Sequence, residues 1–92
     1  MSRAILLHPH DTVATLLDRV QAGGDITLSD GRVIRAAEDI PIYFKIAIQP
    51  MERGVDVMKY GQTIGRAIDR IAIGEMVHTH NLVSNRAQVS CN

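Results

Sequence analysis

Two stretches that begin twenty residues apart, Met51-Glu52-Arg53-Gly54-Val55-Asp56-Val57 and Ile71-Ala72-Ile73-Gly74-Glu75-Met76-Val77, carry the same pattern. Each follows an Ala-Ile pair, at Ala47-Ile48 and Ala67-Ile68, and each then gives an apolar anchor, a glycine and a strand-like run. Glycine suits a tight turn at that point because it tolerates positive φ values. The repeat therefore predicts short β units whose aliphatic side chains fill a common core.

The repeat continues upstream in a weaker form. A degenerate third copy begins at Ile40-Pro41-Ile42 and ends at Ile46, with Tyr43 at the position of the glycine. Three such units, with Pro41 and Pro50 marking breaks, predict a compact, curled β domain rather than a flat sheet.

Sequence patterns in the N-terminal half of the chain predict two further β elements. Residues 25–29 and 32–36 alternate apolar and polar side chains on either side of Asp30-Gly31, a pair that tolerates the positive φ values of a type I′ turn, so we expect a β-hairpin there. Residues 4–7 form an apolar run that reads as a short buried strand. It ends at His8-Pro9-His10, because proline cannot continue a strand ladder.

One stretch between these elements has helical rather than β spacing. Four apolar residues fall at i, i+3, i+4 and i+7, as on one face of an α-helix: Val13, Leu16, Leu17 and Val20. Asp11 offers a carboxylate to cap such a helix, and Gly23-Gly24 supplies a left-handed stop. We therefore expect a mainly β fold with one short α-helix near the N-terminus.

Composition limits the kinds of partner. The chain has 92 residues, 46% of them hydrophobic, and its ten basic and ten acidic residues cancel. This balance disfavours nucleic acid and anionic membranes as partners, because both need a basic footprint. The single cysteine, Cys91, excludes an intramolecular disulfide and fits a reducing cytoplasm, and the apolar N-terminal run is too short for a signal or membrane segment. We expect one domain over residues 1–83 and a polar tail over 84–92, loose unless a partner orders it.

All four histidines occur in two His-x-His pairs, His8/His10 and His78/His80. On an extended strand, His78 and His80 would point to the same face, where they could bind a divalent metal or act as acid and base on an anionic substrate. The alternative is a pair that is merely exposed on an edge strand or hydrogen-bonded at an interface. For the first pair we expect a strand-end turn in which one ring is exposed and the other caps the backbone.

Three more polar residues could take part in a site. Lys45 and Lys59 each follow a turn-like stretch, and either could neutralise a substrate carboxylate, although such lysines are often simply solvated. Asn81 could donate to an oxyanion or hold a loop. No carboxylate spacing completes a recognised metal motif, and no phosphate loop, nucleophile elbow or dinucleotide fingerprint is present in the sequence.

Taken together, these motifs resemble a known family. They are His8-Pro9-x-Asp11-x-Val13, Lys45-Ile46-Ala47, Lys59-Tyr60-Gly61-x-x-Ile64-Gly65-x-Ala67 and Ile71-x-x-Gly74-x-x-Val77-His78-x-His80-Asn81. In this order they are similar to the N-terminal domain of the altronate and galactarate dehydratases, a SAF domain with a β-clip fold. The resemblance covers roughly residues 4–83. Two departures stand out: Tyr43-Phe44 replaces the glycine-histidine pair of the family pattern, and Thr12 stands where asparagine is usual.

The resemblance implies a hydro-lyase that acts on sugar acids such as altronate or galactarate. It implies abstraction of the proton beside a carboxylate and loss of the β-hydroxyl as water, assisted by iron or manganese held mainly by a large subunit. On this reading the chain is a small subunit that pairs with a separately encoded large one, with His78 and His80 as catalytic or metal-binding groups. Lys45, Lys59 and Asn81 would bind the substrate. The related sulfolactate sulfo-lyases, which eliminate sulfite, are an alternative, as is a β-clip module that docks or gates without catalysis. Whether the domain also self-associates stays open.

Overall fold

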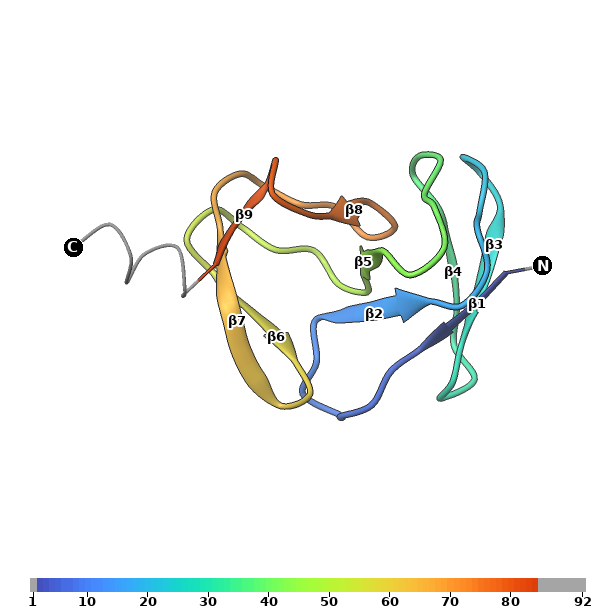
Figure 1. Ribbon diagram of the computed structural model, residues 1–92, viewed down its shortest axis with the longest axis horizontal. Helices are drawn as coiled ribbons and strands as arrows, with labels where there is room; N and C mark the ends of the chain where they lie inside the picture. Colours follow the sequence, from blue (N-terminus) through green and yellow to red (C-terminus); the bar gives the residue numbers. More distant parts are fainter. Residues whose placement is uncertain (1, 85–92) are drawn as a thin grey trace.

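The chain folds into one sheet of six strands and another of three (Figure 1). The computed structural model describes residues 2–84. The strands of this part are β1 (Ser2–Ile5), β2 (Val13–Leu16), β3 (Asp25–Leu28), β4 (Val33–Arg35), β5 (Lys45–Ala47), β6 (Asp56–Lys59), β7 (Gln62–Ala67), β8 (Met76–Val77) and β9 (Leu82–Ser84). The expected polar tail, residues 84–92, lies outside the described residues apart from its first member.

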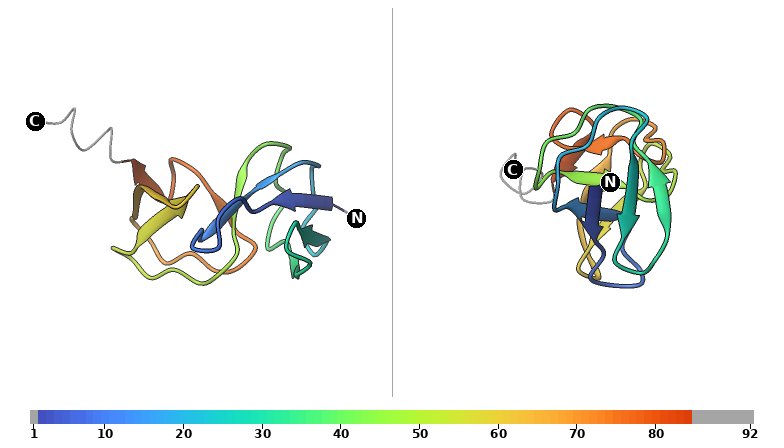
Figure 2. Two further views of the ribbon diagram at one scale, coloured as in Figure 1. Left: turned by 90° about the horizontal axis from the view of Figure 1, so that it is seen from below. Right: turned by 90° about the vertical axis from the view of Figure 1, so that its right-hand side faces the viewer.

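The smaller sheet lies at one end of the molecule, and the larger sheet runs from the other end to the middle (Figure 1). The larger has the order β4-β3-β1-β2-β5-β8, and the smaller has the order β6-β7-β9. All strand pairs are antiparallel except β1 with β3. Figures 1 and 2 show short strands that curl around one another, with β2, β5 and β8 between the two ends. The predicted curled, mainly β architecture is confirmed.

Two clusters of buried aliphatic side chains hold the ends together, and β2 and β5 contribute to both. On β2, Leu16 points into the first cluster and Val13 into the second. On β5, Ile46 points into the first and Ala47 into the second. Successive side chains of a strand face opposite sides, so a strand that lies between two cores must be apolar on both faces. Neither cluster is therefore complete without strands that the other also uses.

The sequence repeat appears in the structure as two turns that face each other. Met51 and Ile71 form an antiparallel bridge, with the N–H of each donating to the carbonyl of the other at 2.8 Å. Three residues after each anchor, Gly54 and Gly74 adopt positive φ values of 91° and 87°. Both turns then lead into a strand, β6 and β8 respectively. The predicted repeat is confirmed.

A second pair of turns repeats this arrangement in the other half of the chain. Val20 and Ile40 form the same reciprocal bridge, at 3.0 and 2.9 Å. Three residues later, Gly23 has a φ of 83° and Tyr43 a φ of 72°. The degenerate copy at Ile40 is thus confirmed, but the expected common core is wrong, because Ile40 is buried in the first cluster whereas Met51 and Ile71 are buried in the second. The copy that begins at Val20 was not predicted, because its anchor had been assigned to a helix.

The predicted N-terminal helix is wrong: the described residues contain no helix, and 13–16 form strand β2. One face of this strand packs into the first cluster and the other into the second, so Ala14 is buried as well as Val13 and Leu16. Leu17, which the helical spacing placed on the buried face, is 36% exposed. Strand pairing of β2 with β5, which lies far along the chain, outweighs the helical spacing of the local apolar residues. No helix in this part of the chain could cross a membrane.

The predicted hairpin is confirmed as β3 and β4. Its turn differs from the expected type I′, which needs two residues with positive φ. Of Asp30 and Gly31 only Gly31 has a positive φ, at 97°, and its N–H donates to the carbonyl of Leu28 at 2.9 Å. This geometry is that of a three-residue loop with a glycine bulge. The carboxylate of Asp30 instead accepts hydrogen bonds from the backbone N–H and from the Nε–H of Arg32, and these bonds stabilise the loop.

Replacing Tyr43 by glycine is expected to stabilise the domain by about 0.5–1 kcal/mol, because a side chain at positive φ is strained. The ring is 72% exposed, so little burial would be lost. Thermal unfolding should show a raised Tm for Tyr43→Gly. Tyr43→Ala, which keeps a Cβ at the same φ, is the matched control and should show no comparable gain. A lower Tm for Tyr43→Gly would contradict the expectation.

Candidate active-site face

The segment from His78 to Asn81 is a turn that directly follows β8. The N–H of Asn81 donates to the carbonyl of His78 at 3.0 Å, which closes the turn. The buried side chain of Asn81 fixes it twice: Oδ1 accepts the N–H of His78 at 2.9 Å, and Nδ2 donates to the carbonyl of Met76 at 2.8 Å. His78 and His80 are both exposed on this turn.

The expected extended geometry of His78 and His80 is therefore wrong. The strand ends at Val77 because the amide of Asn81 takes the hydrogen bonds that a further strand residue would make. Of the two roles considered for Asn81, its contacts are those of a residue that holds a loop. The histidines are presented by a fixed turn rather than by a strand, and this still leaves both imidazoles open to solvent.

Lys45 lies beside this turn although it is distant in the sequence. It pairs in register with Val77, the residue before His78, across the β5–β8 ladder. The preceding residue, Phe44, places its ring 5.0 Å from the ring of His78. The Tyr43-Phe44 departure from the family pattern thus brings an apolar ring against one of the two candidate catalytic histidines.

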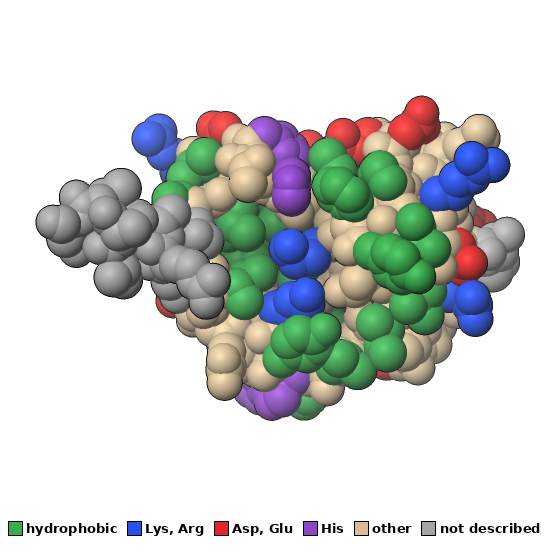
Figure 3. Space-filling view, viewed as in Figure 1, with side chains coloured by type: hydrophobic (Ala, Val, Ile, Leu, Met, Phe, Trp, Pro, Cys, Tyr) green, Lys and Arg blue, Asp and Glu red, His purple; other side chains and the backbone are tan. Residues whose placement is uncertain are grey.

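Lys59 completes a basic pair at the end of β6. Its Nζ lies 4.8 Å from the centroid of the Tyr60 ring. The pKa of Lys45 is lowered, first by burial of its ammonium group and second by the positive charge of Lys59. Figure 3 shows basic side chains together on one face, between histidines at its upper and lower margins and beside apolar side chains.

The other margin of this face is the loop around His8 and His10. The imidazole Nδ1 of His8 accepts the N–H of His10 at 3.1 Å, and the two ring centroids are 5.3 Å apart. His10 is exposed. The expectation that one ring caps the backbone while the other is exposed is confirmed. The ring of His8 also covers Gly61, where a Cβ atom would lie only 2.8 Å from the ring.

Asp11 joins this loop to the turn that carries Lys59, a role the sequence analysis missed. Its buried carboxylate accepts the N–H of Tyr60 at 3.0 Å and that of Gly61 at 2.8 Å. Both residues have positive φ, 56° and 74°. The adjacent Thr12 accepts the N–H of Met58 through Oγ1 at 3.0 Å. Asp11 was expected to cap a helix, and nothing local in the sequence indicates a partner so far along the chain.

The described residues contain no group of three or more His, Cys, Asp or Glu side chains placed to hold a metal ion. His78 and His80 could supply two nitrogen ligands, which is fewer than a typical protein metal centre requires. Residues 2–84 therefore do not by themselves fit a metal site.

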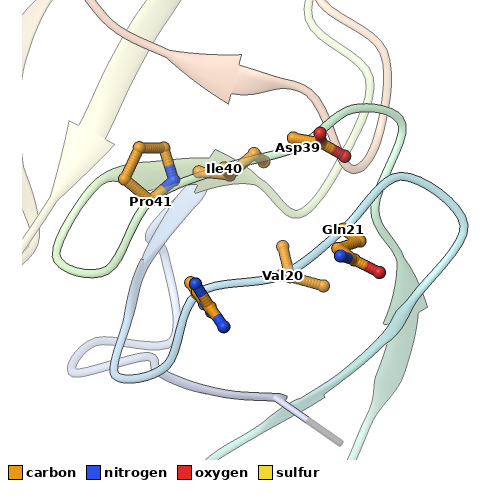
Figure 4. Close-up of a pocket in the computed structure, with 6 residues that line it drawn as sticks. Val20, Gln21, Asp39, Ile40 and Pro41 are labelled. Carbon is orange, nitrogen blue, oxygen red and sulfur yellow. The ribbon is translucent and has the colours of Figure 1, made fainter.

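One surface hollow lies elsewhere on the molecule. It has a volume of about 360 Å³ and is lined by residues on both sides of the Val20–Ile40 bridge, including Arg19 and Asp39 (Figure 4). None of the predicted site residues lines it. The candidate site is instead an open face, as expected for one wall of a larger site.

Replacing Lys45 by methionine is expected to raise the free energy of unfolding at pH 7 by roughly 0.5 kcal/mol, after allowance for solvent screening. The lowered pKa of Lys45 means that the folded state holds this proton less tightly than the unfolded state. The charged ammonium group therefore destabilises the folded state. This destabilisation is complete below the folded-state pKa and disappears as pH rises towards the ordinary pKa of 10.5. Urea unfolding at pH 7 and pH 10 should show that the difference in the free energy of unfolding between the variant and the wild type is smaller at pH 10. Arg53→Met, at an exposed turn, is the control, and a destabilised Lys45→Met would contradict the argument.

Comparison with known proteins identifies the family. The family model of the altronate/galactarate dehydratase SAF domain matches residues 2–85. The chain belongs to this family. The resemblance seen in the sequence motifs is thereby confirmed, and the open face described above is the face of a SAF domain.

Relatives of this SAF domain include whole enzymes and separate subunits. It is 34% identical to altronate dehydratase of Bacillus subtilis over 89 residues, which is 97% of this chain but 18% of that protein. It is 33% identical to altronate dehydratase of Escherichia coli, over 88% of this chain and 16% of that protein. It is 31% identical to (2R)-sulfolactate sulfo-lyase subunit alpha of Chromohalobacter salexigens, over 94% of this chain and 99% of that protein. The chain thus spans less than a fifth of the altronate dehydratases and nearly the whole of the sulfo-lyase subunit.

Proposed function

We propose that this SAF domain is the small subunit of a two-component hydro-lyase. The reaction removes water from a sugar acid such as altronate or galactarate and yields a 2-keto-3-deoxy acid. The observation that carries the proposal is that Lys45, Lys59 and the His78/His80 turn, which belong to separate sequence motifs, gather on one open face. Family membership supports the reaction type.

The side chains suit the steps of such an elimination. Lys45 and Lys59 bind the carboxylate and make the adjoining C–H more acidic. One imidazole of the pair His78/His80 accepts that proton, and the C–O bond at the next carbon breaks as the hydroxyl leaves with a proton from the other imidazole. The enol that remains rearranges to the 2-keto acid. Water is the only other product, so no oxidant or reductant is needed.

A large dehydratase chain would complete the site. An open face cannot exclude water or enclose a substrate, which elimination chemistry requires. The altronate dehydratases, which are much longer than this chain, and the subunit naming of the sulfo-lyase relatives support a partner of this kind. We propose that iron or manganese is held mainly by that chain, since residues 2–84 do not fit a metal by themselves, and no step above depends on the metal. The single cysteine of the sequence fits a cytoplasmic enzyme.

A carbon–sulfur lyase is the second candidate. It is favoured by the near end-to-end match to the sulfolactate sulfo-lyase subunit alpha. The same residues would act in the same order, with sulfite rather than water as the leaving group. A docking or gating module without catalytic groups is the third possibility, and it predicts that the histidines are dispensable.

Reconstitution tests these proposals. The chain is co-purified with a large dehydratase chain encoded in the same genome, iron or manganese is supplied, and 2-keto acid formation is measured from altronate, galactarate and sulfolactate. We expect turnover of one of these substrates to be at least tenfold faster than with the large chain alone. Release of sulfite would select the second candidate. Equal rates with and without the small chain would refute a catalytic subunit.

A further inference from the structure

The turn between β6 and β7 has an unusual backbone. Tyr60 has a φ of 56° and Gly61 a φ of 74°, so two successive residues lie in the left-handed region. Glycine adopts this region freely, whereas a tyrosine there is strained. The Tyr60 ring is 54% exposed, so its burial does not offset the strain. Such strain persists only where surrounding contacts hold the residue in place.

Asp11 supplies these contacts. Its buried carboxylate accepts the N–H of Tyr60 through Oδ2 at 3.0 Å and the N–H of Gly61 through Oδ1 at 2.8 Å. A turn that directs successive N–H groups towards one point suits an anion, and a carboxylate has one oxygen for each of them. None of the ion pairs within residues 2–84 involves Asp11. Its charge is therefore committed to this turn.

The same loop also holds the residue before Lys59. The N–H of Thr12 donates to the carbonyl of Met58 at 3.1 Å, and the Oγ1 of Thr12 accepts the N–H of Met58 at 3.0 Å. Lys59 thus lies between two residues, Met58 and Tyr60, whose backbones are both hydrogen-bonded to the loop that contains Asp11. The backbone of Lys59 is therefore fixed from both sides.

The Tyr60 ring extends this restraint to the side chain of Lys59. The Nζ of Lys59 lies 4.8 Å from the centroid of the ring. A cation over an aromatic face is attracted to it and keeps its charge. The direction of the ring depends on the positive φ of Tyr60, which the carboxylate of Asp11 maintains. Loss of this carboxylate would let the backbone relax and would move the ring away from the ammonium group.

We infer that Asp11 is a positioning residue, which fixes the ammonium group of Lys59 on the candidate active-site face through the Tyr60–Gly61 turn. Asp11 acts through Lys59 and does not itself contact a substrate. The inference rests on the proposed function only in taking Lys59 to bind the substrate. The placement of Lys59 is a property of the chain alone.

NMR of the chain alone tests the placement. The sequence has two lysines, so their side-chain signals can be told apart with the variant Lys59→Met. The ring current of Tyr60 should shift the signal of the methylene group beside the Lys59 Nζ away from that of a free lysine. Asp11→Asn removes one acceptor oxygen and places an amide N–H against a backbone N–H, so we expect this signal to return towards the free value.

Two further variants control for lost stability. Thr12→Val removes a hydrogen bond of the same loop but leaves the carboxylate of Asp11 on the turn, so the Tm should fall while the Lys59 signal keeps its shift. Asp11→Ser, which is smaller and keeps one acceptor oxygen, replaces Asp11→Asn if the amide does not fit the buried site. Amide spectra establish that each variant is folded.

A double-mutant cycle in the reconstituted enzyme tests the role in the reaction. Asp11→Asn is expected to reduce kcat/KM by about tenfold when Lys59 is present and to have no further effect in the Lys59→Met variant, because the two residues act through one contact. A merely structural role would cost the same in both backgrounds. An unchanged Lys59 signal in Asp11→Asn, or equal losses in the two backgrounds, would overturn the inference. A displaced Lys59 signal together with an inactive wild-type complex would refute the proposed reaction and leave the placement standing.

Discussion

Gly74→Ala is expected to lower the free energy of unfolding by about 4 kcal/mol or more, which is enough to unfold much of a small domain. A Cβ atom at this position would overlap the carbonyl oxygen of Arg35 and would lie 3.0 Å from the backbone nitrogen of Ala37. Both neighbours are backbone atoms and cannot move without displacing the chain. The positive φ of 87° adds a conformational cost.

The repeat supplies a matched control for this substitution. Gly54 occupies the equivalent place in the other copy, with a φ of 91°, and a Cβ atom there would meet no other atom within 4 Å. Gly54→Ala should therefore cost only the conformational part, about 1 kcal/mol. Urea unfolding followed by circular dichroism measures both. Equal losses for the two variants would mean that the contact with Arg35 is not responsible.

One of the two variants His78→Ala and His80→Ala removes the imidazole that accepts the substrate proton. This variant is expected to reduce kcat of the reconstituted enzyme by about a hundredfold or more, since positioned acid–base groups contribute on this scale. Both rings are exposed, so the melting temperature should change little. His10→Ala, which removes an exposed imidazole from the other turn, is the control and should retain kcat within about twofold. Unchanged activity in the double variant of His78 and His80 would leave a docking or gating module as the better description.

The larger part of the β fold could be predicted because its signals are local. A glycine three residues after an aliphatic anchor specifies a turn wherever it occurs, and the Asp30-Gly31 pair between alternating runs specifies a hairpin. The helix prediction failed for a tertiary reason. Strand β2 lies between β1 and β5 and is buried on both faces, so its apolar residues run together instead of alternating, and a run of this kind can imitate helical spacing. The signal that could have corrected it was present, since Val20 and Gly23 have the same spacing as Met51 and Gly54.

The candidate site was predictable in its members but not in its arrangement. Residue chemistry pointed to the histidines and to both lysines. The contact between Phe44 and His78 and the hydrogen bonds of Asp11 join segments that only the folded chain brings together. Lys45 and Lys59 were both expected to bind the substrate, but nothing in their spacing indicated that β5 and β6 would bring them to the same face.

The strands β2 and β5, which both cores share, have a mechanical consequence. A chain severed just before β5 would leave each fragment with its own bridge, but the first fragment would lack β5 and the second would lack β2, and each interior needs the strand it lacks. Such halves should be unable to persist alone and should recover order only by reassociating. A substitution that destabilises either core is therefore expected to destabilise the other core as well. The candidate active-site face includes Lys45 of β5, one of the two strands that both cores share.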